Sequence, residues 1–316
     1  MHHDDLADTV PPPAPPRLAL GPLLYHWPRQ QVRRFYAAME VLPLDVVYLG
    51  ETVCSRRQEL RLNDWLAIAQ RLKGAGKQVV LSTQVLIAST DEATALHRIV
   101  ENGEFLVEAG DMGAVHLLAG RMPFVAGMHL NLYNPAALAW MAGLGATRWV
   151  MPLELPAAAL AALQAARPPG LQTEVFAYGR MPLAYSAQCL TARHRNLSKD
   201  DCRFSCLQHP DGMTLRTRER EGLLVLNGLQ MQSARVFNLV GEIDALRALG
   251  VDVLRLSPQA EHMEEIVRLF DAVRRHAMAP AEALRQTLPW MPDLPCNGYW
   301  HGQPGRDQRG AAARSS

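Results

Sequence analysis

Short apolar runs alternate along the chain with segments whose apolar residues recur at helical spacing. This alternation is typical of β/α units built on a largely parallel sheet. The apolar runs predict eight strands, at residues 18–25, 45–50, 78–83, 114–118, 124–128, 147–152, 172–178 and 251–257. Eight such strands predict a TIM-barrel-like parallel β/α barrel with an imperfect repeat.

Capping residues and glycines mark the expected helix ends. Asn63 or Asp64 can cap a helix after the second strand, and the glycines of residues 74–76 can end it. Asn134 followed by Pro135 predicts the start of another helix. Two further markers are Pro156 at a helix start and Gly250 at the helix end before the eighth strand.

The repeat is irregular in two places. Five residues separate the fourth and fifth predicted strands, and about seventy separate the seventh and eighth. The long excursion holds three cysteines and then Asn227-Gly228, which predicts a hairpin turn between apolar runs. A doubly wound open sheet is the alternative, because periodicity does not reveal whether a sheet closes. Closure requires the strands at 18–25 and 251–257 to pair.

Composition fits one large domain. The chain has 316 residues, of which 48% are hydrophobic, and we predict a single domain over 18–301 between disordered tails at 1–17 and 302–316. The formal net charge of +1 argues against nucleic-acid binding. No run reaches the roughly 20 apolar residues of a membrane span. The N-terminal residues also lack the features of a signal peptide, so a cytoplasmic location is expected.

Four of the five cysteines form the main chemical candidate. Cys189, Cys202 and Cys206 follow one another as C-x12-C-x3-C, and Cys54 comes directly after the second predicted strand. Cys54 and Cys189 both follow strand ends, where β/α folds place their sites, so the four thiols can meet at one rim. An odd cysteine count without an export signal argues against paired structural disulfides.

Four thiolates suit either a tetrahedral zinc ion or an iron-sulfur cluster. Structural zinc sites usually have two closely spaced cysteine pairs, whereas only Cys202 and Cys206 are close here, and this favours a cluster. Small buried apolar cysteines are the alternative. Cys296 lacks nearby partners and is expected to be packed or spare. The basic residues that could favour the thiolates are Arg56, Arg57, Arg193, His194 and Arg203.

Other polar residues near the predicted strand ends are weaker candidates. They are His129, Asn131, Tyr178, Glu51 and Glu154. No acid-base pair stands out among them, so no catalytic residue is assigned. The chain has no glycine-rich phosphate loop, H-E-x-x-H or G-x-S-x-G motif, so nucleotide, zinc-protease and serine-hydrolase functions lack their usual sequence support.

The run EVFAYGRMPLAYSAQCLTAR, from Glu174 to Arg193, resembles the signature E-x-F-x-H-G-x-M-C-x-x-Y-S-G-x-C of the collagenase-like peptidase family U32. The matching residues are Glu174, Phe176, Gly179, Met181, Tyr185, Ser186 and Cys189. Tyr178 replaces the histidine of the signature, Pro182 its first cysteine and Ala187 its second glycine. These departures argue against peptidase activity.

Further segments, among them VVYLGETVCSRR, VENGEFLVEA, VLNGLQ and CNGYW, are similar to the branch of this family that acts in anaerobic ubiquinone biosynthesis. The resemblance covers nearly all of residues 18–301 and implies a 4Fe-4S cluster. Its ligands would be Cys54, Cys189, Cys202 and Cys206.

The resemblance also implies partners and a reaction. The partners would be the paralogue UbiU, as a heterodimer, and the lipid-binding accessory protein UbiT. The implied reaction is O2-independent hydroxylation of ubiquinone precursors, with prephenate as the oxygen donor. Two alternatives stay open, a collagenase-like peptidase and a non-catalytic, cluster-bearing partner of UbiU.

Overall fold

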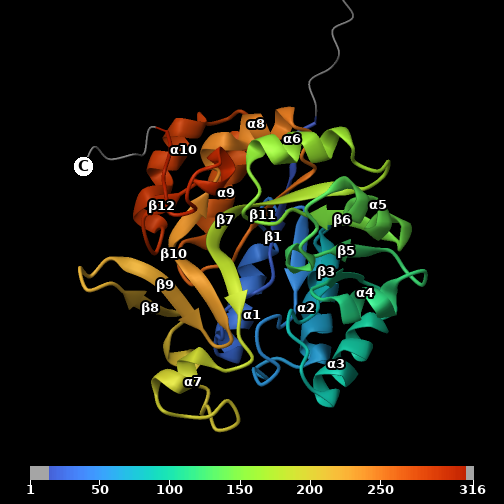
Figure 1. Ribbon diagram of the computed structural model, residues 1–316, viewed down its shortest axis with the longest axis vertical. Coiled ribbons are helices and arrows are strands. Elements are labelled where there is room, and N and C mark those ends of the chain that lie inside the picture. Colours follow the sequence, from blue (N-terminus) through green and yellow to red (C-terminus); the bar gives the residue numbers. More distant parts are fainter. Residues whose placement is uncertain (1–13, 311–316) are drawn as a thin grey trace, which may run out of the picture.

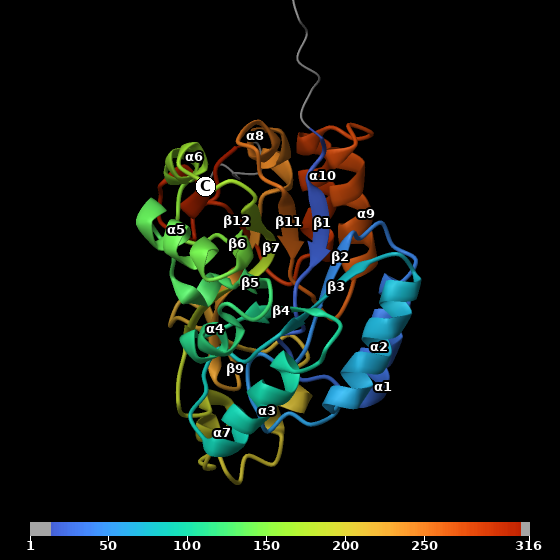
Figure 2. The ribbon, with the colours of Figure 1, turned by 90° about the vertical axis from the view of Figure 1, so that its right-hand side faces the viewer.

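Eight parallel strands close into a barrel. The computed structural model describes residues 14–310. In the barrel each strand pairs with the next, and β11 pairs with both β1 and β7, so no edge is left open (Figure 2). The strands are β1 (Arg17–Leu20), β2 (Val46–Leu49), β3 (Gln78–Ser82), β4 (Leu106–Ala109), β5 (Phe124–Ala126), β6 (Ala146–Val150), β7 (Gln172–Tyr185) and β11 (Val253–Leu256). This confirms the predicted TIM-barrel-like fold and excludes the open sheet.

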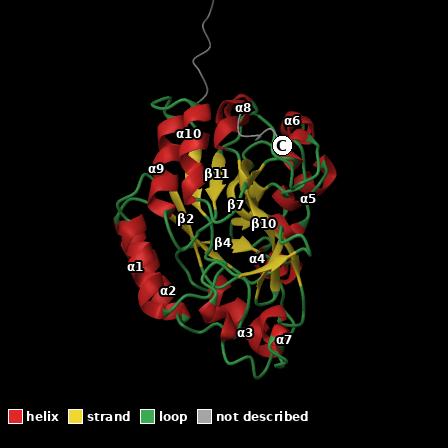
Figure 3. Cartoon of the chain, turned by 90° about the vertical axis from the view of Figure 1, so that its left-hand side faces the viewer, coloured by secondary structure: helices red, strands yellow, loops and turns green. Residues whose placement is uncertain are grey.

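Helices surround the strands and bury their apolar faces against them (Figure 3). They are α1 (Arg29–Met39), α2 (Leu62–Gly74), α3 (Thr90–Val100), α4 (Met112–Leu118), α5 (Pro135–Gly143), α6 (Ala157–Ala165), α8 (Ile243–Ala248), α9 (Met263–Arg274) and α10 (Pro280–Thr287). Within the described residues, no helix is both long and apolar enough to cross a membrane.

One predicted strand is wrong. Residues 114–118 belong to α4, which Asp111 caps by accepting a hydrogen bond from the backbone N–H of Ala114. Val115 and Leu118 are buried there while His116 is exposed, which is the spacing of a helix face. The fourth strand is instead β4, a short strand whose apolar run is interrupted by Glu108. This shift removes the irregular spacing between the fourth and fifth strands.

The helix markers are mostly confirmed. Asn134 accepts a hydrogen bond from the N–H of Ala137 and begins α5. The predicted cap of α2 is wrong, because the helix begins one residue earlier than Asn63 and its N-cap is Arg61. Asp64 lies inside the first turn, where its carboxylate accepts a hydrogen bond from the N–H of Arg61 at 3.1 Å. The carboxylate thus satisfies a free N–H at the helix end without being the cap.

Strand β7 continues past the barrel and carries the predicted excursion (Figure 1). Gly179 lies where β7 leaves, with φ of +130°, and a Cβ at this position would lie 2.5 Å from Cβ of Ser257. Beyond it β7 pairs antiparallel with β10, which forms with β9 the hairpin predicted at Asn227-Gly228. The elements of the excursion are α7 (Leu190–His194), β8 (Met213–Arg216), β9 (Gly222–Asn227) and β10 (Gln230–Asn238). A later strand, β12 (Pro295–Cys296), follows the barrel in the sequence and pairs with β10.

The tails are only partly described. Residues 1–13 and 311–316 lie outside the described residues. In the part between 302 and 310, Asp307 accepts a hydrogen bond from the N–H of Asn297, and Arg309 donates its own N–H to the Asn297 side chain. The predicted division into one domain and two disordered tails stays a prediction.

The barrel interior contains a buried charge network instead of an entirely apolar core. Arg255 on β11 pairs with Glu108 at 2.7 Å and with Glu174 on β7 at 2.5 Å. Arg148 on β6 lies 3.5 Å from Glu174 and donates a hydrogen bond to the Tyr48 hydroxyl. Burial raises the pKa of Glu174, but the two guanidinium groups outweigh it and the net pKa is lowered. The carboxylate is therefore held in its charged form.

Replacing Glu174 by Gln is expected to lower the free energy of unfolding by about 3–5 kcal/mol, because two buried guanidinium groups lose a counter-charge. Urea unfolding at neutral pH measures this loss. The matched control is Glu40→Gln, which removes the half-buried partner of the exposed Arg71 at 2.7 Å and is expected to cost about 1 kcal/mol or less. Equal losses in the two variants would contradict a stabilising role for the network.

Candidate functional site

The excursion and the loop after β2 bring the four predicted cysteines into one region. Cys54 follows β2 and Cys189 is the N-cap of α7. Cys54, Cys189 and Cys202 belong to one buried cluster, which also contains Leu24. Cys206 lies in the 3-10 helix Ser205–Gln208, and the proximity of Cys189 and Cys202 helps to raise its pKa. All four cysteines are free.

Burial favours the neutral thiol form of Cys54 and Cys206. It raises the pKa of Cys54 to about 11, and it also raises the pKa of Cys206. Arg57 opposes both shifts, and among the five predicted basic neighbours it is the one that acts on both thiols. Metal binding would therefore have to displace protons, so affinity for a metal should increase with pH.

Arg57 holds three loops together beside the thiols. Its guanidinium donates hydrogen bonds of 2.7 Å to the carbonyl of Leu24 and to the side-chain oxygen of Asn227, and it lies 3.8 Å from the Glu51 carboxylate. Glu51 in turn accepts hydrogen bonds from the N–H groups of Val53 and Cys54. The loop that carries Cys54 is thus fixed by charge and backbone contacts.

The residue types suit an iron-sulfur centre. Four free thiols form a soft donor set. Beside them the buried atoms Nε2 of His26 and Nε of Arg57 lack hydrogen-bond partners in the described part of the chain, while Nδ1 of His26 lies 3.2 Å from Sγ of Cys206. Among residues 14–310, however, no three His, Cys, Asp or Glu side chains are placed to hold a metal ion. The cluster and its ligand set stay a prediction.

Cys296 lies apart from this region. It is in β12, fully buried in the main core, and pairs with Phe237 of β10. Burial raises the pKa of its thiol to about 12. Cys296 is therefore a packed residue in this structure, which makes it a suitable control for substitutions of the other four cysteines.

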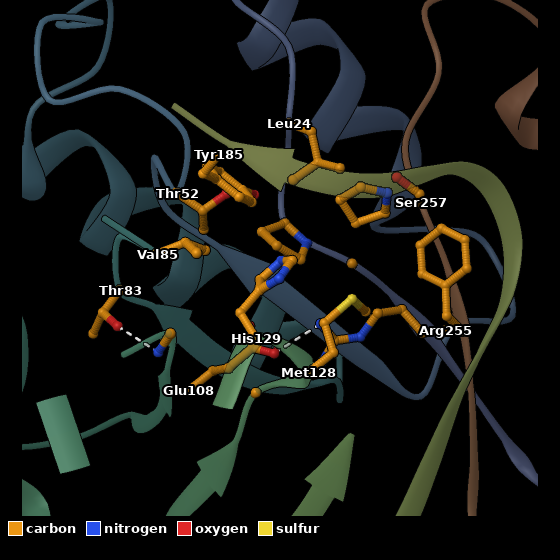
Figure 4. Close-up of a pocket in the computed structure, with 16 residues that line it drawn as sticks. Leu24, Thr52, Thr83, Val85, Glu108, Met128, His129, Tyr185, Arg255 and Ser257 are labelled. Carbon is orange, nitrogen blue, oxygen red and sulfur yellow. Dashed lines mark hydrogen bonds and ion pairs between the residues drawn. The ribbon is translucent and has the colours of Figure 1, made fainter. Parts of the chain in front are cut away.

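A cavity of about 40 Å³ lies at the carboxyl ends of the barrel strands (Figure 4). Thr52, His129, Tyr185 and Arg255 contribute to its wall. Two buried polar atoms in this wall, Oγ1 of Thr52 and Nη2 of Arg255, have no hydrogen-bond partner within the described residues. Unpartnered buried polar groups are costly, so they favour a polar ligand or water at this position.

Tyr185 and Leu24 connect the cavity with the cysteines. Both residues line the cavity and pack in the cysteine-containing cluster. The Tyr185 ring also meets the His129 ring edge to face, with centroids 5.0 Å apart, and its hydroxyl accepts a hydrogen bond from Gln230. Leu24 and Tyr185 thus belong both to the cavity wall and to the cluster that contains the thiols.

Of the weaker sequence candidates, Asn131 ends a short helix, and Tyr178 and Glu154 form local hydrogen bonds. Asn131 adopts a left-handed conformation at the end of a short 3-10 helix. The Tyr178 hydroxyl donates to Gln259 at 2.7 Å, and Tyr133 donates to Glu154. Sequence reasoning missed the cavity residues Thr52, Glu108 and Arg255. The available signal for Arg255 was that it is the one basic residue in the predicted apolar strand at 251–257.

Replacing His129 by Gln is expected to flatten the loss of stability on acidification. Burial and the nearby Arg255 lower the pKa of His129 to about 4 from an ordinary value of 6.5. The unfolded chain therefore binds more protons between pH 6.5 and 4, and the folded state loses stability as the pH falls through this window.

One such histidine lowers the free energy of unfolding by about 2 kcal/mol between pH 7 and pH 5. Urea unfolding at both pH values, with the exposed His97→Gln as a control, measures this difference. An unchanged pH dependence in His129→Gln would show that the ring titrates normally.

Comparisons with known proteins give distant structural similarities and one family match. The chain overlaps with the solved structure of the U32 peptidase Mk0906 at 13% identity and a TM-score of 0.44, covering 77% of this chain and 93% of that one. For dihydrodipicolinate synthase from Agrobacterium tumefaciens the values are 11% and 0.36, with 87% and 81% covered. Such distant similarities carry no information about activity. The sequence model of peptidase family U32 matches residues 30–295, and the chain therefore belongs to this family.

Proposed function

We propose that the chain is an iron-sulfur subunit that acts with UbiU in the O2-independent hydroxylation of ubiquinone precursors. The proposal rests on its resemblance to UbiV, a member of the same family. The structural observation that supports it most directly is that Leu24 and Tyr185 line the barrel cavity and also pack in the cluster that contains Cys54, Cys189 and Cys202. Cys54, Cys189, Cys202 and Cys206 would hold a 4Fe-4S cluster.

The chemistry of the donor set supports a redox role. Hydroxylation of an aromatic ring without O2 requires electron transfer, and an iron-sulfur cluster exchanges single electrons whereas zinc does not. Arg57, which lies against Cys54 and Cys206, would offset part of the negative charge that four thiolates bring into a buried region. The polar atoms of Thr52 and Arg255 would orient a polar group of a ligand in the cavity.

The collagenase-like peptidase alternative has less support at the residues of the family signature. Tyr178 stands at the histidine position, is fully buried and is bonded to Gln259. Pro182, which lines the cavity, stands at the position of a cysteine. Pro182 has no nucleophilic or basic side-chain atom, and burial raises the pKa of the Tyr178 hydroxyl, which keeps it protonated. The other alternative is that this chain carries the cluster but is not catalytic. It differs from our proposal only in that the ubiquinone precursor would react on UbiU.

Anaerobic purification or reconstitution is expected to give a brown protein with about four iron and four sulfide ions per chain, as a 4Fe-4S cluster requires. Alanine variants of Cys54, Cys189, Cys202 and Cys206 should each lose most of this iron, and Cys296→Ala should retain it. One zinc ion without iron, or iron loss restricted to Cys296→Ala, would overturn the ligand assignment. Thermal unfolding of each variant separates cluster loss from misfolding.

Deletion of the gene is expected to lower ubiquinone only in cells grown without oxygen. The wild-type gene and Cys296→Ala should restore it, whereas Cys189→Ala should not, because the cluster would lack a ligand. Quinone analysis of cells grown with and without oxygen provides the measurement. Normal ubiquinone in the anaerobic deletion strain, or peptide hydrolysis by purified protein that persists after iron removal, would contradict the proposed function.

A further inference from the structure

A second cavity lies outside the barrel, between α2 and α3, which are neighbours in Figure 2. Its volume is about 390 Å³, within the range of roughly 300–1,000 Å³ that small-molecule sites occupy. Three segments form its wall, namely the loop from the end of β2 into α2, the loop after β3, and α3. The family resemblance and the cysteines do not account for this cavity.

One part of the wall is apolar. Leu60, Trp65 and Leu96 are buried side chains that line the cavity, and Ile87 and Ile99 are half-buried beside them. These residues come from α2, α3 and the loops that precede the two helices. An indole ring and branched aliphatic chains around an open volume favour a ligand with a hydrocarbon or aromatic body.

The acidic residues of the wall already have partners within the chain. Glu92 accepts hydrogen bonds of 2.6 Å from the Ser55 hydroxyl and from the N–H of Ala88. Glu51 accepts two backbone N–H groups and faces Arg57. Both carboxylates are therefore held in place by hydrogen bonds from the chain itself.

Two arginines in the wall are not neutralised. Arg61, the N-cap of α2, and Arg98, in the last turn of α3, are exposed and line the cavity. Neither guanidinium group has an ion-pair or hydrogen-bond partner in the part of the chain that the structure describes, whereas neighbouring Arg29 and Arg33 both pair with Asp64. The cavity thus combines an apolar wall with two free cationic groups that can bind an anionic head in a bidentate manner.

We infer that this cavity is a binding site for an amphipathic organic anion. The carboxylate or other anionic head binds Arg61 and Arg98, and the apolar body lies against Trp65, Leu96 and Ile99. The site is separate from the cysteines, although Glu51 and Arg57 form a wall common to both regions. The inference goes beyond the proposed function and does not depend on a bound cluster.

Isothermal titration calorimetry of the full chain with decanoate, decanol and decyltrimethylammonium tests the inference. Decanoate is expected to bind at least about tenfold more tightly than the neutral and cationic probes, because only its head can pair with the arginines. The double variant Arg61→Gln/Arg98→Gln should weaken decanoate binding by about tenfold. Arg34→Gln, which removes an exposed arginine of α1 that does not line the cavity, should leave binding unchanged.

Two further variants test the location of the apolar body. Ala95 lines the cavity from an exposed position on α3, so Ala95→Trp should fill the volume and abolish decanoate binding without disturbing the core. Ile99→Glu should also abolish it, by placing a negative charge in the apolar wall. Circular dichroism confirms folding of each variant. Absence of decanoate binding, equal affinity for the three probes, or binding that survives both substitutions would overturn the inference.

Discussion

The pairing of Arg255 with Glu174 and Glu108 is the interaction on which the barrel depends most. Arg255 lies on β11, the strand that closes the barrel, and Glu174 lies on β7, its neighbour. Each charge is buried, so any other register of these two strands would leave a guanidinium group or a carboxylate without its partner. Purely apolar strands slide past one another at lower cost. The network therefore specifies how the ends of the barrel meet, in addition to any stability it provides.

Strand β7 links the closed barrel to the cysteine region. Its first half is fixed in the barrel between β6 and β11, and its second half forms the antiparallel ribbon with β10. Gly179 permits the change of partner within one strand. Tyr185, at the end of β7, contacts His129 on one side and the cysteine cluster on the other. A single continuous strand thus sets the position of the cavity wall and of Cys189.

Local sequence patterns predicted most of the fold because buried strands and capped helices carry short-range signals. They failed at β4, where Glu108 interrupts a short apolar run while the next apolar run, at 114–118, belongs to a helix. The grouping of the cysteines at one rim was predictable because strand ends in β/α folds face one side. The charge network was not predictable, since its members on β4, β6, β7 and β11 are brought together only by the closed barrel.

The contacts of Arg57 have a consequence for how the protein matures. The side chain connects the loops after β1 and β2 with Asn227 at the end of β9, a partner 170 positions away. Asn227 also donates a hydrogen bond to the carbonyl of Leu24, 203 positions away. Contacts of such high contact order form late, because a long loop must close before they stabilise anything. Until these contacts form, the region around the four thiols is not yet folded and the thiols remain accessible. The interval between synthesis and closure is therefore the period in which these cysteines are most open to oxidation.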